Sequence, residues 1–260
     1  MRIQGDDPVI DTLLQGDDEA VFVLISLMRR SDTALLYSDG RSYLTAQTNP
    51  TLPIWIYVNE HANARTEEEL CAILREAFAQ NPNLRINAQP GFAEDVLRRF
   101  AQEAGARLSE GKTLYAYTCA ELTPVPPVGQ LVASAAKYKD DIVRLIKQAG
   151  DTSDEAAARF AEAHVGSKNL FLWQDGGIVS MARIADEGPR YSRINAVVTE
   201  RERRNHGYAK MVVGEAVKHI LARGNIAQLY SDAANPCSNR AYQALGFRKV
   251  GELKEYSIQQ

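Results

Sequence analysis

The chain has 260 residues, 45% of them hydrophobic, and a formal net charge of −3, so it can bury a substantial core within one large domain or two small ones. This mild acidity gives no reason to expect nucleic acid or an anionic membrane as a partner. The longest apolar run, residues 20–28, is too short to cross a bilayer, and the polar start is unlike a secretory signal. We therefore expect a cytoplasmic protein. Three widely separated cysteines predict neither a disulfide framework nor a metal site.

The first half of the chain alternates between strand and helix patterns. Residues 6–30 indicate two short helices, and a hairpin is expected at Asp39-Gly40, a dipeptide typical of tight turns. Thr66 and Glu69 have the spacing of a capping box at the start of the next helix. Further strands are predicted at 54–59, 84–88 and 113–120, and a helix at 93–104.

A proline-rich segment, residues 123–129, reads as an extended linker. It divides the chain into an N-terminal α/β domain of unknown role, residues 1–125, and a second domain, residues 128–260. The second domain is expected to follow the order strand, two helices, three strands, helix, strand, helix, strand. Its predicted elements are a strand at 131–136, helices at 139–149 and 155–165, a hairpin turning at 175–177, strands at 194–199 and 227–233, and a helix within 235–247.

A polar turn joins strand 194–199 to a strongly amphipathic helix. The first amides of a helix lack partners and carry the positive end of its dipole, so they bind phosphate well. Gly207 lets a ligand approach the backbone, and Arg201, Arg203 and Arg204 add positive charge. The turn therefore predicts a ligand with more than one phosphate. For Arg201 and Arg203 individually, the sequence favours ordinary solvated loop charges over contacts with the ligand.

Two motifs follow one another in this region. The turn from Arg204 to Ala209, R-N-H-G-Y-A, resembles the Q/R-x-x-G-x-G/A signature with which the GNAT family of acyltransferases holds the pyrophosphate of coenzyme A. Residues 235–247, N-P-C-S-N-R-A-Y-Q-A-L-G-F, resemble the family's second signature, in which a helix carrying Asn and Tyr ends at Gly-Phe. An ordinary strand–turn–helix unit is the alternative.

The resemblance implies a mixed α/β fold at residues 128–260, with helices on both faces of a central sheet, as in bacterial two-domain members of the family. The first half has a similar alternation of strands and helices, and a degenerate GNAT-like copy is one interpretation of it. Its corresponding turn, residues 90–93, lacks the Arg and the G-x-A pair. A coenzyme A site is therefore not expected there.

The implied activity is N-acetylation without a metal. A primary amine of a small molecule or peptide would attack acetyl-coenzyme A directly in a ternary complex. Tyr242 matches the proton donor for the leaving thiolate, with a buried core Tyr as the alternative. The implied coenzyme A contacts are Val197, Val198, Thr199, Arg204, Asn205, His206, Gly207, Tyr208, Ala209, Asn235 and Ser238.

The general base is less clear in the sequence. Many family members place a Glu near the start of the central strand, but residues 188–193 contain no carboxylate. Asp232 is the candidate base, with a turn or cap role as the alternative. His164 fits a helix end better than a base. Asn235 is assigned to cofactor orientation, because Ser238 is expected to cap the helix.

Two other functions are compatible with parts of the sequence. One is a catalytically silent module that binds or senses coenzyme A. The other is a P-loop NTPase, since residues 106–113 match the bare pattern of a small residue, four others and G-K-T. That chemistry needs a strand before the loop and a helix after it. Here the predicted order is reversed, which favours a solvated turn.

Overall fold

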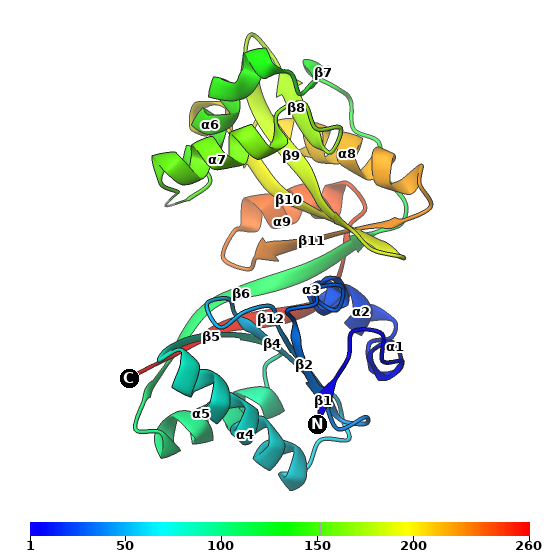
Figure 1. Cartoon of the computed structure of the whole chain (residues 1–260). Helices are drawn as coiled ribbons and strands as arrows, with labels where there is room; N and C mark the ends of the chain where they lie inside the picture. The colour runs from blue at the N-terminus through cyan, green and yellow to red at the C-terminus, as the bar shows by residue number, and fades with distance from the viewer. Residues whose placement is uncertain (151) are drawn as a thin grey trace. The chain divides into compact units, whose positions relative to one another are not determined.

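The structure, a computed structural model, describes residues 1–150 and 152–260. The chain forms two compact units. The first comprises Met1–Ala116, Asp232–Ala234 and Val250–Gln260, and the second comprises Tyr117–Ser231 and Asn235–Lys249. Strand β6 (Arg107–Cys119) carries the chain from the first unit into the second, and β12 (Arg248–Gln259) returns it to the first (Figure 1).

This division does not follow the boundary expected at the proline-rich segment. That segment lies inside the second unit, where the Thr123 amide donates to the Leu245 carbonyl oxygen at 3.0 Å. At the other end, the indole N–H of Trp173 donates to the Val128 carbonyl oxygen at 2.7 Å. The composition of the segment is that of a linker, but its ends are held by residues far away in the sequence.

The first unit has a mixed sheet in the strand order β1-β2-β3-β4-β5-β12-β6. Strands β4 and β5 are parallel and flank helix α4, while β12 runs antiparallel to β5. The elements of this unit before β6 are β1 (Arg2–Ile3), α1 (Val9–Leu13), α2 (Asp17–Val21), α3 (Val23–Met28), β2 (Leu35–Ser38), β3 (Tyr43–Gln47), β4 (Ile54–Val58), α4 (Ala64–Gln80), β5 (Asn83–Ala88) and α5 (Phe92–Glu103).

Local signals predicted most elements of this unit, and two of the predicted helical regions need correction. The hairpin at Asp39-Gly40 is confirmed, because β2 and β3 pair antiparallel on either side of it. Helix α4 begins earlier than predicted, with Asn63 as its N-cap and Thr66 as the reciprocal partner three residues later. Residues 6–30 contain three short helices instead of two.

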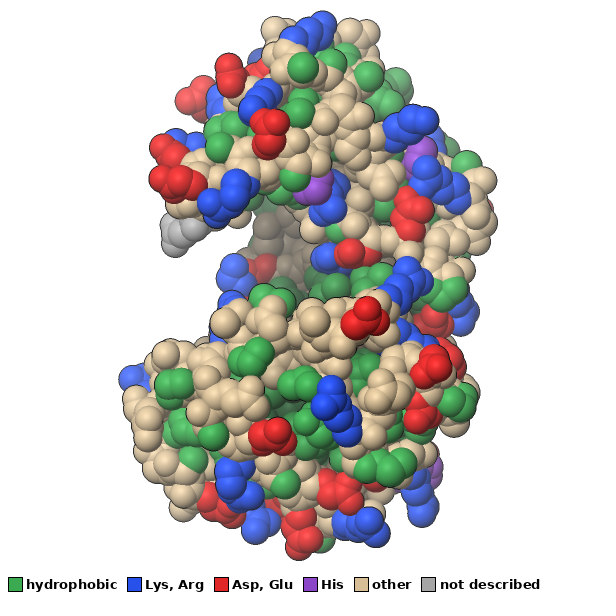
Figure 2. Space-filling view, viewed as in Figure 1, with side chains coloured by type: hydrophobic (Ala, Val, Ile, Leu, Met, Phe, Trp, Pro, Cys, Tyr) green, Lys and Arg blue, Asp and Glu red, His purple; other side chains and the backbone are tan. Residues whose placement is uncertain are grey.

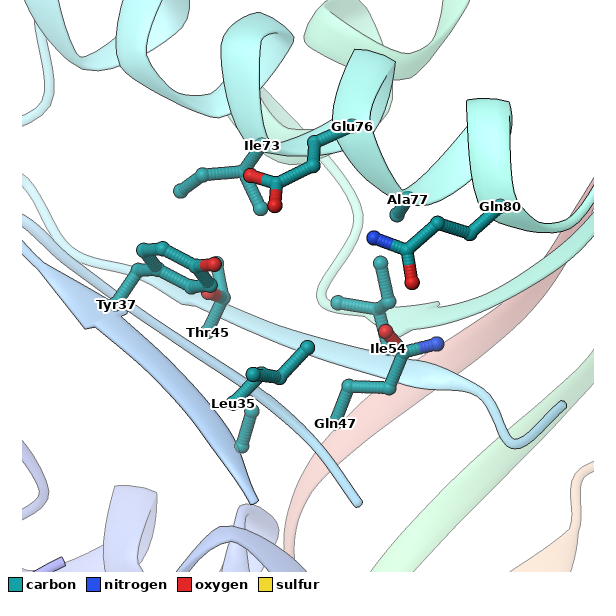
Figure 3. Close-up of a pocket in the computed structure, with 10 residues that line it drawn as sticks. Leu35, Tyr37, Thr45, Gln47, Ile54, Ile73, Glu76, Ala77 and Gln80 are labelled. Atoms are coloured by element: carbon teal, nitrogen blue, oxygen red, sulfur yellow. The ribbon is translucent and has the colours of Figure 1, made fainter. Parts of the chain in front are cut away.

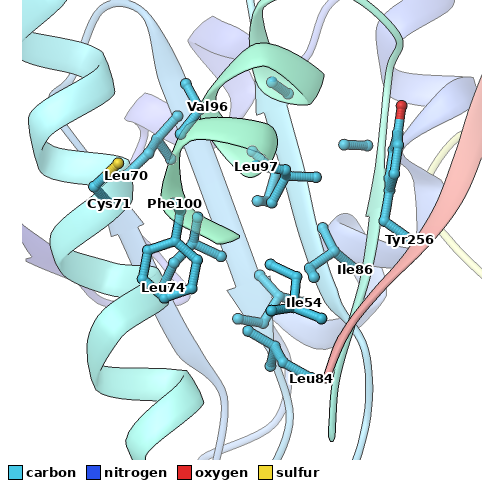
Figure 4. Packing of buried hydrophobic residues seen from close by; sticks show 14 of the residues in the cluster. Ile54, Leu70, Cys71, Leu74, Leu84, Ile86, Val96, Leu97, Phe100 and Tyr256 are labelled. Carbon is cyan, nitrogen blue, oxygen red and sulfur yellow. The ribbon is translucent and has the colours of Figure 1, made fainter. Parts of the chain in front are cut away.

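The core of the first unit includes side chains from the C-terminal strand. Helices α4 and α5 contribute Leu70, Leu74 and Phe100 to a cluster that Tyr256 of β12 also joins (Figure 4). Ile258 belongs to the same cluster and is fully buried. The last eleven residues of the chain are thus part of the packing of the first unit.

Ile258→Ala is expected to destabilise the protein by about 2–5 kcal/mol, since it removes a buried branched side chain and leaves a cavity. Ser257→Ala, one residue earlier and on the opposite side of the strand, is expected to be near neutral. Urea unfolding followed by tryptophan fluorescence compares the two variants. Equal midpoints would show that β12 adds little to the core.

The second unit also has a mixed sheet, in the order β11-β10-β9-β8-β7. Strands β10 and β11 are parallel, and the other described pairs are antiparallel. Its elements are β7 (Gln130–Ala133), α6 (Lys139–Lys147), α7 (Asp154–His164), β8 (Leu170–Gln174), β9 (Ile178–Glu187), β10 (Tyr191–Thr199), α8 (Tyr208–Leu221), β11 (Ile226–Asp232) and α9 (Pro236–Ala244). The predicted mixed α/β fold is confirmed.

Helices cover both faces of this sheet. Leu172 packs in one cluster with the apolar residues of α6 and α7. Successive strand residues point to opposite faces, and the neighbouring Phe171 meets His219 of α8 with ring centroids 5.6 Å apart. Helices α6 and α7 therefore lie on one face, and α8 lies on the other (Figure 1).

The two halves of the chain repeat one order of elements. Each half has three consecutive strands, a helix, a strand parallel to the third, a second helix and a final strand, and the two final strands, β6 and β12, are those that pass between the units. The shared order agrees with the interpretation of the first unit as a degenerate copy of the second.

The P-loop match is not a nucleotide-binding loop. Residues 107–113 are extended and form the start of β6, and α5 precedes them. The rejection of an NTPase therefore stands, although the segment is a strand and not the predicted turn. Within the described residues, no helix has the length and apolar character needed to cross a membrane.

Candidate functional site

Strands β10 and β11 pair over only part of their length. Their described ladder runs from Tyr191 opposite Ile226 to Ile194 opposite Leu229. Beyond it, β10 continues beside β9 with a register shift between Asn195 and Val198, where Ala196 takes a positive φ of 49°. This is the geometry of a β-bulge in the β9–β10 pair, at which the bulged strand bends. The predicted contact residues 197–199 lie just past the last β10–β11 pair.

The end of β10 is held in place on its other side. The hydroxyl of Ser180 donates to the Val198 carbonyl oxygen at 2.9 Å and lies 2.9 Å from the hydroxyl oxygen of Thr199. The Glu200 amide donates to the Val179 carbonyl oxygen at 2.9 Å, and the Glu200 carboxylate pairs with Arg144 of α6. Residues 197–199 therefore form a fixed strand end beside the point where β11 has separated.

The turn that follows leads directly to an uncapped helix start. After the short 3-10 helix Arg201–Arg203, Asn205 and Gly207 take positive φ values of 65° and 83°. Gly207 is the N-cap of α8, no side chain caps the helix, and the first helical bond runs from the Met211 amide to the Gly207 carbonyl oxygen at 3.2 Å. The amides of residues 208–210 precede that bond, so they point out of the helix at the positive end of its dipole.

Gly207 keeps the space beside these amides open. A Cβ built at this position would find no atom closer than 3.6 Å, and its nearest neighbours are the ends of the Lys210 and Met211 side chains. A side chain here would be strained by the left-handed backbone and not by contacts with the protein. The volume that it would fill is the volume through which a phosphate would approach.

Arg203 is not a solvated loop charge. Its guanidinium donates to the Asp175 carboxylate at 3.1 Å, to the Asp175 carbonyl oxygen at 3.0 Å and to the Tyr208 hydroxyl at 3.1 Å. Tyr208 in turn donates to the Asp175 carboxylate, which raises the pKa of the phenol. The charge of Arg203 is thus neutralised, and its role is to tie the turn and the first residue of α8 to the β8–β9 hairpin.

Arg204 and Arg201 remain as the cations of the turn. The Nε of Arg204 donates to the Thr199 carbonyl oxygen at 3.3 Å, which links the turn to the strand end. The Arg201 side chain is exposed. In the described ranges, no carboxylate lies within 4 Å of either guanidinium. In the tautomer that carries the proton on Nδ1, His206 donates to the Arg204 carbonyl oxygen at 2.8 Å, and its ring stacks on that of Tyr208 with centroids 5.9 Å apart.

The cap of α9 is Asn235, and the prediction of Ser238 was wrong. The Asn235 side chain accepts from the Ser238 amide at 3.1 Å, and Pro236 occupies the first helical position. Proline is favoured at that position, because its missing N–H would have no helical partner. Asn235 therefore holds the start of the helix that carries Tyr242.

Tyr242 is a buried phenol in the second unit. Its side chain is packed near Tyr117 and Phe247, with ring centroids 6.3 Å and 5.9 Å away. Burial raises the pKa of Tyr242 to about 12, against the opposite effect of a side-chain hydrogen bond with Ser238. The phenol is therefore protonated near neutral pH. It is both a core residue and a group that can donate a proton.

Asp232 is engaged as a turn residue. Its carboxylate accepts from the Ala234 amide at 2.9 Å and lies 3.9 Å from the Lys112 ammonium. It packs with the first unit, whereas the other predicted site residues belong to the second. His164 ends α7, as predicted, with its ring 4.6 Å from that of Phe160. Burial and the nearby charge of Arg183 lower the pKa of His164.

Sequence reasoning missed a polar cluster on β9 and β10, which we define as Arg183, Asp186, Arg193 and Asn195. The ladder places Asn195 opposite Arg183 and Arg193 opposite Asp186. The sequence shows that two polar residues lie close together on each of the two strands. Their pairing across the two strands depends on a register that bulges shift twice.

A hollow in the first unit is too small for such a ligand. In the first unit, a pocket between α4 and the sheet is lined by Tyr37, Gln47, Glu76 and Gln80 among others (Figure 3). Its cavity of about 20 Å³ has room for roughly one water molecule. On the face shown in Figure 2, acidic and basic side chains are interspersed on each unit. Among the described residues, no group of three potential metal ligands gathers.

Comparisons with known proteins find a family model that matches part of the chain and solved structures with a similar fold. A protein-family model described as "FR47-like protein" matches residues 179–257 of the chain. A GCN5-related N-acetyltransferase from Sphaerobacter thermophilus has a TM-score of 0.67 at 14% identity, over 98% of this chain and 93% of that one. A GNAT-family acetyltransferase from Colwellia psychrerythraea gives 0.61 at 10% identity, over 100% and 99%.

A third similar structure is a tandem GNAT protein from the clavulanic acid biosynthesis pathway, with a TM-score of 0.52 at 14% identity over 99% of this chain and 97% of that one. No curated protein matches the sequence. At these identities the structural likeness is one of fold, and a fold of this kind is compatible with acyl transfer in general. The chain therefore has the fold of these GNAT structures, and residues 179–257 are similar to the FR47-like family.

Proposed function

We propose that the chain is an acetyl-coenzyme A-dependent N-acetyltransferase that acts on a primary amine in a ternary complex. The observation that supports this most is the separation of β10 from β11 immediately before the uncapped start of α8. This arrangement offers a strand edge and a set of helix amides within one unit. A ligand with an extended amide-containing arm and a pyrophosphate would use both.

Each group has a distinct part in the proposed mechanism. The backbone of residues 197–199 would pair with the amides of the pantetheine arm as a further strand would. The amides of residues 208–210 and the Arg204 guanidinium would hold the pyrophosphate, with Asn205, His206 and Gly207 shaping the turn. Acetyl-coenzyme A supplies an activated acyl group as a thioester. Asn235 and Ser238 would hold the α9 end of the site.

Proton transfers complete the proposed reaction. The attacking nitrogen must be a neutral amine, so its ammonium form first loses a proton to a base. As the carbon–sulfur bond breaks, Tyr242 would give its proton to the departing sulfur. Asp232 remains the proposed base on the evidence of its sequence position alone, because its contacts in the structure are those of a turn residue.

The test combines ligand binding with turnover. Acetyl-coenzyme A at about 100 times its dissociation constant should stabilise the folded protein by about 2.7 kcal/mol, seen as a rise in melting temperature. Coenzyme A release across a panel of primary amines should then identify an acceptor. Stabilisation without turnover on any amine would favour a silent coenzyme A-binding or sensing module. No stabilisation would overturn the proposed site.

A further inference from the structure

The polar cluster on β9 and β10 lies on the sheet face that α6 and α7 cover. Met181 packs in the cluster beneath those helices, together with Val198. Arg183 is two residues after Met181 on β9, so its side chain points to the same face. Asn195 lies opposite Arg183 in the ladder and therefore shares that face. On this face of the sheet, the polar cluster therefore follows the apolar residues that pack against α6 and α7.

The two arginines of the cluster differ in how they are paired. Arg193 donates from Nε to the Asp186 carboxylate at 2.8 Å, and a second donor reaches the same oxygen. Arg183 meets neutral oxygens only, at 3.3 Å to the Asn195 side chain and 3.4 Å to the Ala185 carbonyl. Two guanidinium groups and one carboxylate leave the cluster with one excess positive charge, located at Arg183.

The surroundings of Arg183 favour an added carboxylate. Its side chain is partly buried, and burial lowers the pKa of the guanidinium despite the nearby Asp186 charge. Long bonds to neutral acceptors do not compensate fully for lost hydration. No carboxylate among the described residues lies within 4 Å of it. A bidentate carboxylate fits the fork of an arginine better than any other common anionic group.

The cluster is close to the proposed site of acyl transfer. Asn195 precedes Val197 by two residues on β10, and the bulge at Ala196 lies between them. His164 lies near Arg183, and burial together with that positive charge lowers the pKa of its imidazole. An acceptor bound at Arg183 could thus extend its amine toward residues 197–199.

We propose that Arg183 binds the carboxylate of the acceptor, and that the substrate class is primary amines that carry a carboxylate, such as amino acids and their short homologues. This inference rests on the proposed function. In it, Asn195 orients the guanidinium and the Asp186–Arg193 pair keeps the second arginine from competing for the ligand.

The test uses matched acceptors that differ only in the carboxylate. The probes are glycylglycine, 4-aminobutyrate and 6-aminohexanoate, each paired with its carboxamide, assayed with the full chain by coenzyme A release. The carboxylate form of at least one pair is expected to have a kcat/KM about 10-fold or more above its amide, mainly through KM. Equal use of acid and amide in all pairs would overturn the inference while leaving the transferase activity in place.

Variants of Arg183 test whether this side chain causes the preference for carboxylate acceptors. Arg183→Gln should abolish the preference for the carboxylate form, so that kcat/KM for each acid falls to that for its amide, whereas Arg183→Lys should retain part of the preference. Arg223→Gln, an exposed arginine paired with Glu187 in the same unit, is the matched control and should behave as wild type. Loss of both reactions in the same proportion, in folded Arg183→Gln, would assign Arg183 a structural role only.

Calorimetry separates this inference from the proposed function. The same acid and amide probes are titrated into the full chain saturated with coenzyme A. Binding of an acid that its amide lacks, and that Arg183→Gln loses, would support the carboxylate site even without turnover. Absence of any acid-specific binding would overturn the site whether or not acetylation is seen.

Discussion

Gly207→Val is expected to abolish the thermal stabilisation by acetyl-coenzyme A and to lower its affinity by about 100-fold or more, since the side chain would displace phosphate from charge-assisted bonds worth about 1.5–3 kcal/mol each. The new side chain would occupy the open space beside the amides of residues 208–210. Helix α8 should still form, because its buried face is unchanged. Differential scanning fluorimetry and calorimetry with acetyl-coenzyme A measure the two quantities.

Gly224→Val provides the control for backbone strain. Gly224 has a φ of 80°, close to that of Gly207, and a Cβ there would meet no atom within 4 Å. It lies just past the C-terminal end of α8. Both variants carry the cost of a branched residue in the left-handed region, about 1–2 kcal/mol, but only Gly207→Val should lose the ligand. Equal loss in both would mean that strain, and not a blocked phosphate site, explains the effect.

Tyr242→Phe is the second change with a large expected effect, this time on turnover. Loss of a general acid typically lowers kcat by about 10²–10⁴-fold. Because the proton is needed only as the sulfur departs, the dissociation constant of acetyl-coenzyme A should stay nearly unchanged. Stopped-flow measurement of coenzyme A release gives kcat, and calorimetry gives the dissociation constant of acetyl-coenzyme A.

The pH profile adds a second readout for Tyr242. Its pKa is raised to about 12, so the donor form is present at every lower pH and is lost only as the pH rises through that value. The ratio of wild-type to variant kcat should therefore be constant from roughly pH 6 to 9. Tyr256→Phe removes another buried phenol, one that donates to Glu94 in the first unit, and should leave kcat unchanged. Unaltered kcat in Tyr242→Phe would make Tyr242 a packing residue.

The parts of the site that could be predicted from sequence are those built from neighbouring residues. Strand 194–199, the turn after it and the amphipathic helix all depend on local geometry, and the structure has β10, a turn and α8 in that order. The cap of α9 was also within reach of sequence reasoning. Pro236 at the first helical position indicates Asn235 as the cap, and this signal should have outweighed Ser238.

Other features depend on partners distant in the sequence. Arg203 reads as a loop charge until Asp175, 28 residues earlier, is seen to neutralise it. The pairing of Arg183 with Asn195 requires a register that two bulges shift. The unit boundary was missed because a run of prolines resembles a linker, whereas the strand that carries the chain back to the first unit has no local mark of its destination.

Strand β12 has a consequence for how the protein is made. The first unit holds residues from both extremes of the chain, so its sheet cannot be completed until residue 259 has left the ribosome. Until then β5 lacks the antiparallel neighbour that covers residues 83–88, and an uncovered strand edge invites pairing with other chains. Domains generally fold in the order of synthesis. In this chain the first unit cannot complete its sheet until β12 has been synthesised. A product truncated near residue 250 would therefore be prone to aggregation.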